Sequence, residues 1–320
     1  MKTPQILAAS LLALTAASLH ADTFGSGANT FTIDFVTVGN PGNVDDAGAG
    51  GGIYSSPYGG VPYTYQMGKY EISQEMITKA TNLGMTNVTA SPWTGSQPAA
   101  GMTWYEAAAF VNWLNTSTGH QAAYQLNGTN TALTLWTSAQ AWQLGGENLY
   151  RHKDAYYFLP SEDEWYKAAY HKNDGVSVNY WDYPTGSNGV PDGIDSNGDP
   201  SYQAVFNDGF DQGQPNAITS AGSASSAYGT YGQGGNVWEW NESAYDGINN
   251  SSSENRARRG GLWSATENFL RSSGRYNTAP SLSYSLVGFR VASVPEPSCT
   301  VMMIGVVLMA VARRGRVRSL

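Results

Sequence analysis

Two Ser/Thr-x-x-Glu segments are the strongest constraint on how this 320-residue chain can fold. In such a segment the first hydroxyl accepts a hydrogen bond from the backbone three residues later, and the glutamate bonds back, which fixes the start of a helix. Thr103 and Glu106 form one segment and precede apolar residues at helical spacing. Ser161 and Glu164 form the other, which runs to His171. The sequence therefore predicts two well-defined helices.

The remaining elements are expected to be short. Ser73 precedes a third helical pattern, and the alternation over residues 31–35 predicts a strand, followed by a glycine-rich loop at 39–60. Beyond His171, roughly 120 residues rich in glycine and aromatic side chains show no long helical period. We therefore expect a single α+β domain over residues 22–293 with little regular secondary structure.

The N-terminal 21 residues have the pattern of a secretory signal peptide. Lys2 precedes an apolar run from Ile6 to Leu19, and cleavage is expected after Ala21. The run ends at polar Asp22, so it is short for a transmembrane helix. An N-terminal core helix is the alternative interpretation.

At the C-terminal end, a Val-Pro-Glu-Pro-Ser segment precedes an apolar run from Cys299 to Ala312, and an arginine-rich end follows from Arg313. With this arrangement, residues 294–320 resemble the bacterial PEP-CTERM sorting tail. The 14-residue run is shorter than the ~20 residues that span a bilayer comfortably. The resemblance implies a temporary membrane anchor that a membrane protease cuts when the protein reaches the cell surface. A permanent single anchor is the alternative.

Charge and cysteine content narrow the possible partners. The whole chain has 17 Lys and Arg residues and 25 Asp and Glu residues. Without Lys2, the four tail arginines and Glu296, residues 22–294 carry 12 cationic and 24 acidic residues, which gives a net charge of −12. An acidic domain without clustered cations is a poor partner for nucleic acid and a better one for divalent cations. The sole cysteine, Cys299, lies in the tail, so the domain can form no disulfide.

Six segments of the chain form an ordered set of motifs. They are Met67–Ile72 (MGKYEI), Met102–Ala109 (MTWYEAAA), Leu159–Trp165 (LPSEDEW), Gly234–Trp240 (GGNVWEW), Arg259–Trp263 (RGGLW) and Val287–Val291 (VGFRV). With these segments in this order, the chain resembles the formylglycine-generating enzyme family, also called sulfatase-modifying factors, over about residues 65–292. The resemblance implies an elaborated C-type-lectin-like α+β fold.

The resemblance also identifies what this chain lacks. Enzymes of the family oxidise a substrate cysteine with two cysteines of their own and copper, and thiolate is the soft ligand that monovalent copper prefers. The first cysteine corresponds to Ala265, and the second falls within Asn268–Leu270. We therefore expect no copper, no formylglycine-generating activity, and a binding or structural role at the cell envelope. A different metal- or oxygen-dependent enzyme, a carbohydrate-binding module and a simple spacer remain alternatives.

Calcium is the cofactor that the resemblance leaves open. One family site corresponds to the carbonyls of Gly235 and Val237 and the carboxylate of Glu239, which are hard oxygen ligands. A fourth position, usually Asn or Asp, is Gly232 here, so one side-chain oxygen is missing. The alternative for Glu239 is a buried carboxylate that accepts hydrogen bonds from backbone amides.

A second calcium site of the family corresponds to Asp208 and Phe210. Separately, acidic and amide residues over 192–199 have part of the spacing of a calcium loop, but the closing glutamate is missing. A solvated acidic turn is the favoured interpretation of that loop.

Arginine and tryptophan provide the other candidate binding groups. Six arginines gather between 256 and 290, where internal pairing with acids is favoured over binding of an anionic glycan. A sugar-binding groove would need exposed aromatic rings, and an envelope polysaccharide is one possible partner. The tryptophans available for such a groove are Trp93, Trp136, Trp142 and Trp181. No nucleophile, base and orienting residue are recognisable from the sequence.

Overall fold

The computed structural model describes residues 20–48, 57–89, 92–195 and 201–294. Residues 1–19 of the expected signal peptide and residues 295–320 of the expected tail lie outside these ranges. The last two residues of the expected signal peptide, His20 and Ala21, begin the first strand, and Val294 N donates to Tyr156 O at 3.0 Å. Within the described ranges, no helix has the length and apolar character needed to cross a bilayer.

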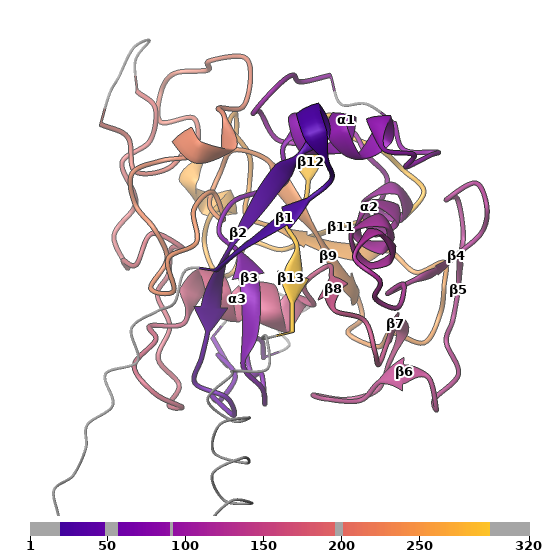
Figure 1. Ribbon diagram of the computed structural model, residues 1–320. Coiled ribbons are helices and arrows are strands. Elements are labelled where there is room, and N and C mark those ends of the chain that lie inside the picture. Colours follow the sequence, from indigo (N-terminus) through magenta and orange to yellow (C-terminus); the bar gives the residue numbers. More distant parts are fainter. Residues whose placement is uncertain (1–19, 49–56, 90–91, 196–200, 295–320) are drawn as a thin grey trace, which may run out of the picture.

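A five-stranded antiparallel sheet forms the centre of the fold, with strand order β1-β2-β3-β13-β8 (Figure 1). Its strands are β1 (His20–Phe24), β2 (Phe31–Val38), β3 (Tyr65–Gly68), β13 (Ala292–Ser293) and β8 (Tyr157–Phe158). The last described strand, β13, pairs with both β3 and β8. Distant parts of the sequence therefore meet in one sheet.

Strand β2 shows why both faces of this sheet are covered. Ile33 and Phe35 point to the core that also contains the first two helices, whereas Val36 and Val38 belong to a second core with Ala168 of the third helix. Side chains alternate between the faces of a strand, so one apolar run serves two cores. The predicted strand at 31–35 is confirmed and extends to Val38.

All three expected helices are present. They are α1 (Gln74–Asn82), α2 (Trp104–Ser117) and α3 (Glu162–Tyr170). Ser73 caps α1, and both capping boxes form as the sequence predicts. In α3, Ser161 Oγ accepts from Glu164 N at 3.2 Å, and Ser161 N donates to Glu164 Oε2 at 2.6 Å. The α3 box places the side chains of its first turn at the pocket described below.

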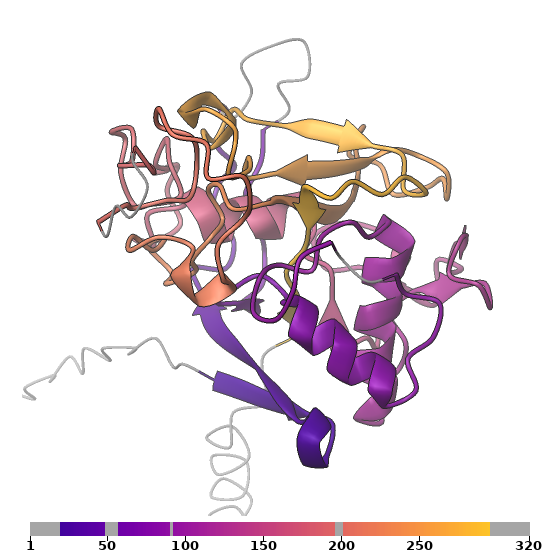
Figure 2. The same cartoon turned by 90° about the horizontal axis from the view of Figure 1, so that it is seen from above.

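A second, four-stranded sheet carries the C-terminal motifs, with order β11-β10-β9-β12 and β12 parallel to β9. Figure 2 shows its orange and yellow strands above helices α1 and α2. Its strands are β9 (Trp238–Ala244), β10 (Arg256–Arg259), β11 (Tyr276–Thr278) and β12 (Val287–Gly288).

The other elements are short. They are β4 (Gln125–Leu126) with β5 (Leu133–Thr134), β6 (Ala141–Trp142) with β7 (Asn148–His152), and the 3-10 turns η1 (Gly27–Asn29), η2 (Ile218–Ser220) and η3 (Glu267–Phe269). Between α3 and β9, η2 is the only helical turn among the described residues. The expectation of short strands within extended loops after His171 is therefore confirmed.

Candidate functional site

A buried arginine lies between two carboxylates where β7, α3 and β9 meet. Arg151 Nε donates to both oxygens of Glu242 at 2.9 and 3.0 Å, and Nη1 and Nη2 donate to Glu164 at 2.9 Å each. Burial alone would raise the pKa of Glu164, but Arg151 and several hydrogen bonds hold it below its usual value. At Glu242 burial prevails and the pKa is raised. The guanidinium is thus fully engaged by protein acids.

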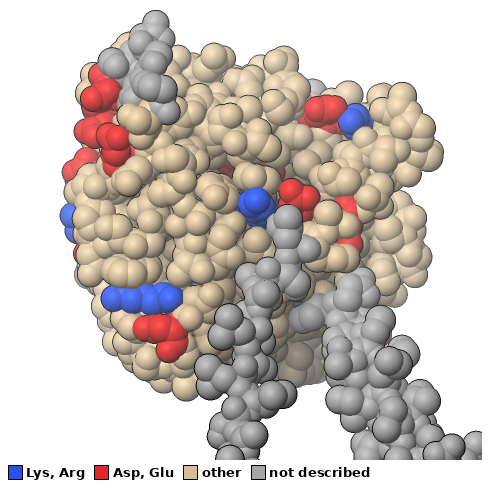
Figure 3. All heavy atoms as spheres, turned by 60° about the vertical axis from the view of Figure 1, so that its left-hand side comes forward, with Lys and Arg blue, Asp and Glu red and all other residues tan. Residues whose placement is uncertain are grey.

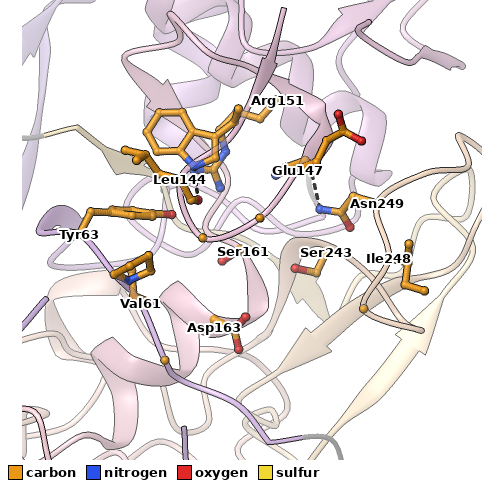
Figure 4. A pocket seen from close by; sticks show the side chains of 17 residues that line it. Val61, Tyr63, Leu144, Glu147, Arg151, Ser161, Asp163, Ser243, Ile248 and Asn249 are labelled. Atoms are coloured by element: carbon orange, nitrogen blue, oxygen red, sulfur yellow. Dashed lines mark hydrogen bonds between the residues drawn. The ribbon is translucent and has the colours of Figure 1, made fainter. Parts of the chain in front are cut away.

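A pocket of about 200 Å³ opens beside this network (Figure 4). Ser161 and Asp163, from the start of α3, and Ser243 of β9 lie on its lower side and point into it. The oxygens of Ser161 and Ser243 accept backbone hydrogen bonds from Glu164 N and Glu162 N, at 3.2 and 2.9 Å. The floor of the pocket is therefore polar and rigidly held.

Apolar side chains form part of the wall and rim of the pocket, beside Glu147 and Asn249. Trp142 and Tyr63 meet edge to face, with ring centroids 5.5 Å apart. Leu144 and Ile248 stand on two separate loops at the rim, each 57% exposed. The β6–β7 turn turns tightly because Gly145 has a φ of +83°, a backbone conformation that residues with a Cβ rarely adopt. The turn carries Leu144 to the edge of the pocket.

Asp163 is an acidic group that points into this space from the start of α3. Burial, chiefly, with Glu162 and Asp45 nearby, raises its pKa from 3.8 to about 7, against the opposing effects of the Gly59 amide and Arg259. Oδ1 accepts from Gly59 N at 3.0 Å. Among the described residues, no hydrogen bond reaches Oδ2. Neither Asp163 nor the pocket was predicted from the sequence, although Asp163 lies inside the predicted capping box.

The calcium candidates of the GGNVWEW segment lie in the deep interior. Glu239 accepts from Arg290 Nε and Nη2 and from Trp165 Nε1, each at 2.7 Å, and is fully buried. Gly235 and Val237 lie just before β9, within the same buried turn. Glu239 thus has a cationic side-chain partner that the sequence analysis did not assign to it.

Glu71 is the acidic residue that sequence reasoning missed at this position. It accepts from Asn236 Nδ2 at 2.6 Å and from Val237 N at 3.4 Å. Its Oε2 would lie 3.3 Å from a Cβ built on Gly232, so a carboxylate from another loop occupies the space next to the missing side chain. Burial and the nearby Glu239 raise the pKa of Glu71 well above its usual value.

Asp208 and Phe210 lie in a different environment. Asp208 is exposed, and its backbone amide donates to Ile194 O at 3.4 Å. Val205 and Gly235 form an isolated β-bridge, so the two predicted calcium segments are adjacent at this point. Asp208, three residues after the bridge, is at the surface, whereas Val237 is buried. Within the described residues, no group of three or more His, Cys, Asp or Glu side chains is arranged to hold a metal ion.

The C-terminal arginines are used mainly inside the protein. Arg259 and Arg275 both bind Glu162, with Nε to Oε1 distances of 2.7 Å, and Arg290 binds Glu239. Internal pairing is therefore confirmed for these three. Arg258 instead lies over the rings of Trp238, Tyr276 and Tyr284. Charged groups are sparse on the face in Figure 3, where acids gather along one edge.

The sequence profile of the FGE-sulfatase family, described as sulfatase-modifying factor enzyme 1-like domain, matches residues 61–294. The chain belongs to this family. No curated protein matches it. The match covers both capping boxes, the buried Arg151 network and the second sheet.

Three solved structures share the FGE-sulfatase architecture. Treponema denticola variable protein 1 has a TM-score of 0.57 and 22% identity, with 86% of this chain and 99% of that chain covered. CarF has a TM-score of 0.54 and 18% identity, covering 82% and 99%. PvdO from Pseudomonas aeruginosa has a TM-score of 0.52 and 17% identity, covering 86% and 98%. The expected α+β, C-type-lectin-like fold of this family is confirmed.

The segment that the resemblance matches to the cysteines of active family enzymes is packed with apolar side chains here. Ala265 is 8% exposed, and its carbonyl accepts from Asn207 N at 2.9 Å. Turn η3 follows, and Leu270 is fully buried. Methyl and isobutyl groups therefore fill this part of the fold.

The four candidate tryptophans do not form one groove. Trp93 donates to Ser285 O, Trp136 packs against His152, and Trp181 lies under Lys172. Trp142 alone among the four lines the described pocket. The sugar groove was an alternative to burial in the core, and Trp142, at 7% exposure, is a core residue that also lines the Arg151 pocket.

Proposed function

We propose that this chain is an exported FGE-sulfatase family member that acts at the cell envelope by binding, not by oxidising a cysteine. The observation that carries the proposal is Ala265, which stands where the resemblance places the first catalytic cysteine. A methyl group can neither bind copper nor exchange with a substrate thiol. The scaffold around it is retained, which suits a role in recognition.

The test is direct. Full-length protein in detergent is incubated with copper, oxygen and a cysteine-containing sulfatase peptide, beside an active enzyme of the family as positive control. We expect no aldehyde by mass spectrometry. Aldehyde formation at a catalytic rate would refute the proposal, and a tightly bound transition metal in the purified protein would indicate a different enzyme.

Placement at the envelope is proposed from the two chain ends. The signal-like residues 1–21 would direct export, and the tail at 294–320 would hold the protein in the membrane until a membrane protease releases it. An envelope polysaccharide is the proposed partner. Cell fractionation of the full chain and of a form ending at Val294 tests this. The shortened form is expected to leave the membrane fraction, and identical distributions would contradict the role of the tail.

We also propose that a calcium ion binds near Glu71, Glu239 and the carbonyls of Gly235 and Val237 and stabilises the fold. Calcium is held by carboxylate and carbonyl oxygens. The support is Glu71, a buried carboxylate that forms no salt bridge within the described residues and lies beside Gly232. A bound cation would compensate its charge.

A further inference from the structure

The Arg151 pocket contains an acidic side chain, Asp163, that forms no ion pair with a described Lys or Arg side chain. Arg151 is the sole Lys or Arg side chain among the described lining residues, and Glu164 and Glu242 already bind it. Glu147 also lines the pocket but points away from its centre in Figure 4. Asp163 therefore faces the space with one free oxygen and no cation within reach of a hydrogen bond. A cationic group on a ligand would match it.

The floor also offers hydroxyl groups to a ligand. Ser161 and Ser243 use their oxygens to accept backbone amides, and no acceptor for either hydroxyl hydrogen is found among the described residues. Each can therefore donate one hydrogen bond into the pocket. The wall contains Trp142, which is 7% exposed and packed against Tyr63, and the rim carries the exposed aliphatic side chains of Leu144 and Ile248. A polar floor below an apolar wall suits a ligand with one polar edge and one apolar face.

We propose that this pocket binds an amino sugar, with its ammonium group against Asp163. The sugar hydroxyls would meet Ser161 and Ser243, and the apolar face of the ring would lie against Leu144 and Ile248 at the rim. A volume near 200 Å³ suits one sugar ring. A neutral sugar satisfies the serines and the apolar wall but leaves Asp163 uncompensated, and an anionic sugar is repelled. This inference rests on the proposed binding role and names the chemical class of its ligand.

The experiment compares three β-1,4-linked oligosaccharides of equal length that differ only at carbon 2. They are glucosamine, N-acetylglucosamine and glucose tetramers, titrated calorimetrically into the full-length protein in detergent. We expect the glucosamine oligomer to bind about 10- to 100-fold more tightly than the other two, as one charge-assisted hydrogen bond contributes. Equal affinity for all three, or no binding, would overturn the inference.

Matched variants localise the binding. Asp163→Asn keeps an oxygen that accepts from Gly59 N but removes the charge, so it should abolish the preference for glucosamine. Leu144→Ser should weaken the binding of all three oligomers. Val190→Ser, at an exposed position outside the pocket lining, should change none of the three affinities. If a glycan binds but both pocket variants leave it unchanged, the inference fails while the proposed binding role stands. Aldehyde formation in the oxidation assay would refute that role separately.

Discussion

At the scale of single residues, Asp163 makes the stability of the protein depend on pH. Its pKa of about 7 in the folded state, against a usual 3.8, means that folding favours the protonated form. The stabilisation is complete below pH 4 and is lost as the pH rises through 7. Asp163→Asn should therefore raise the free energy of unfolding by roughly 2 to 4 kcal/mol at pH 8, and by little at pH 4.

Urea denaturation at the two pH values measures this effect. Asp211→Asn is the control because Asp211 is exposed and also accepts a backbone amide, from Gly213, through Oδ1. It should change the stability by less than ~0.5 kcal/mol at either pH. Parallel stability curves for Asp163→Asn and the unmodified protein would show that the Asp163 carboxylate is well solvated.

Arg151 illustrates the opposite case, a buried charge whose partners depend on it. Arg151→Met leaves Glu164 and Glu242 buried without a cation, so unfolding should become easier by about 3 to 5 kcal/mol. Lys172→Met is the control, since that lysine lies over Trp181 near the surface and contributes about 1 kcal/mol at most. Thermal unfolding of both variants, compared with the unmodified protein, measures the loss of stability. A loss below 1 kcal/mol for Arg151→Met would mean that the carboxylates are protonated or hydrated.

At the scale of elements, the helix starts were predictable because their signals are local. A capping box needs only two side chains three positions apart, and both boxes formed. Thr103→Ala removes the hydroxyl that accepts from Glu106 N at 3.1 Å and should cost about 1 kcal/mol. Thr116→Ala, at an exposed site bonded only to its own helix, should cost less than half of that. Equal effects in chemical denaturation would contradict the assigned role of the cap.

At the scale of the whole molecule, the sites depend on contacts that no local pattern reveals. Glu71 reaches Asn236 across 165 positions, so the sequence showed the missing side chain at Gly232 but not the acid beside it. The pocket likewise gathers residues from Gly60 to Asn249. Resemblance to a family predicted the fold correctly. Of the pocket residues, the sequence analysis named Ser161 for capping and Trp142 as a candidate ring of a sugar groove, and it did not predict that they lie together.

The calcium proposal is also a whole-molecule prediction, because a ligand bound only by the native state stabilises all of it. Chelation should lower the melting temperature by several degrees, and Glu71→Gln should remove most of that response. Magnesium, which prefers fewer protein ligands, should restore less stability than calcium. An unchanged melting temperature in the presence of chelator would contradict the proposed calcium site.

The position of β13 bears on when the protein can acquire its structure. This strand, at residues 292–293, joins β3 to β8, so the sheet stays in two pieces until nearly the whole domain has been synthesised. Pairings over such long sequence separations form slowly. If the chain is exported as proposed, it would remain unfolded enough to pass a translocation channel for most of its synthesis and would complete its central sheet after crossing the membrane.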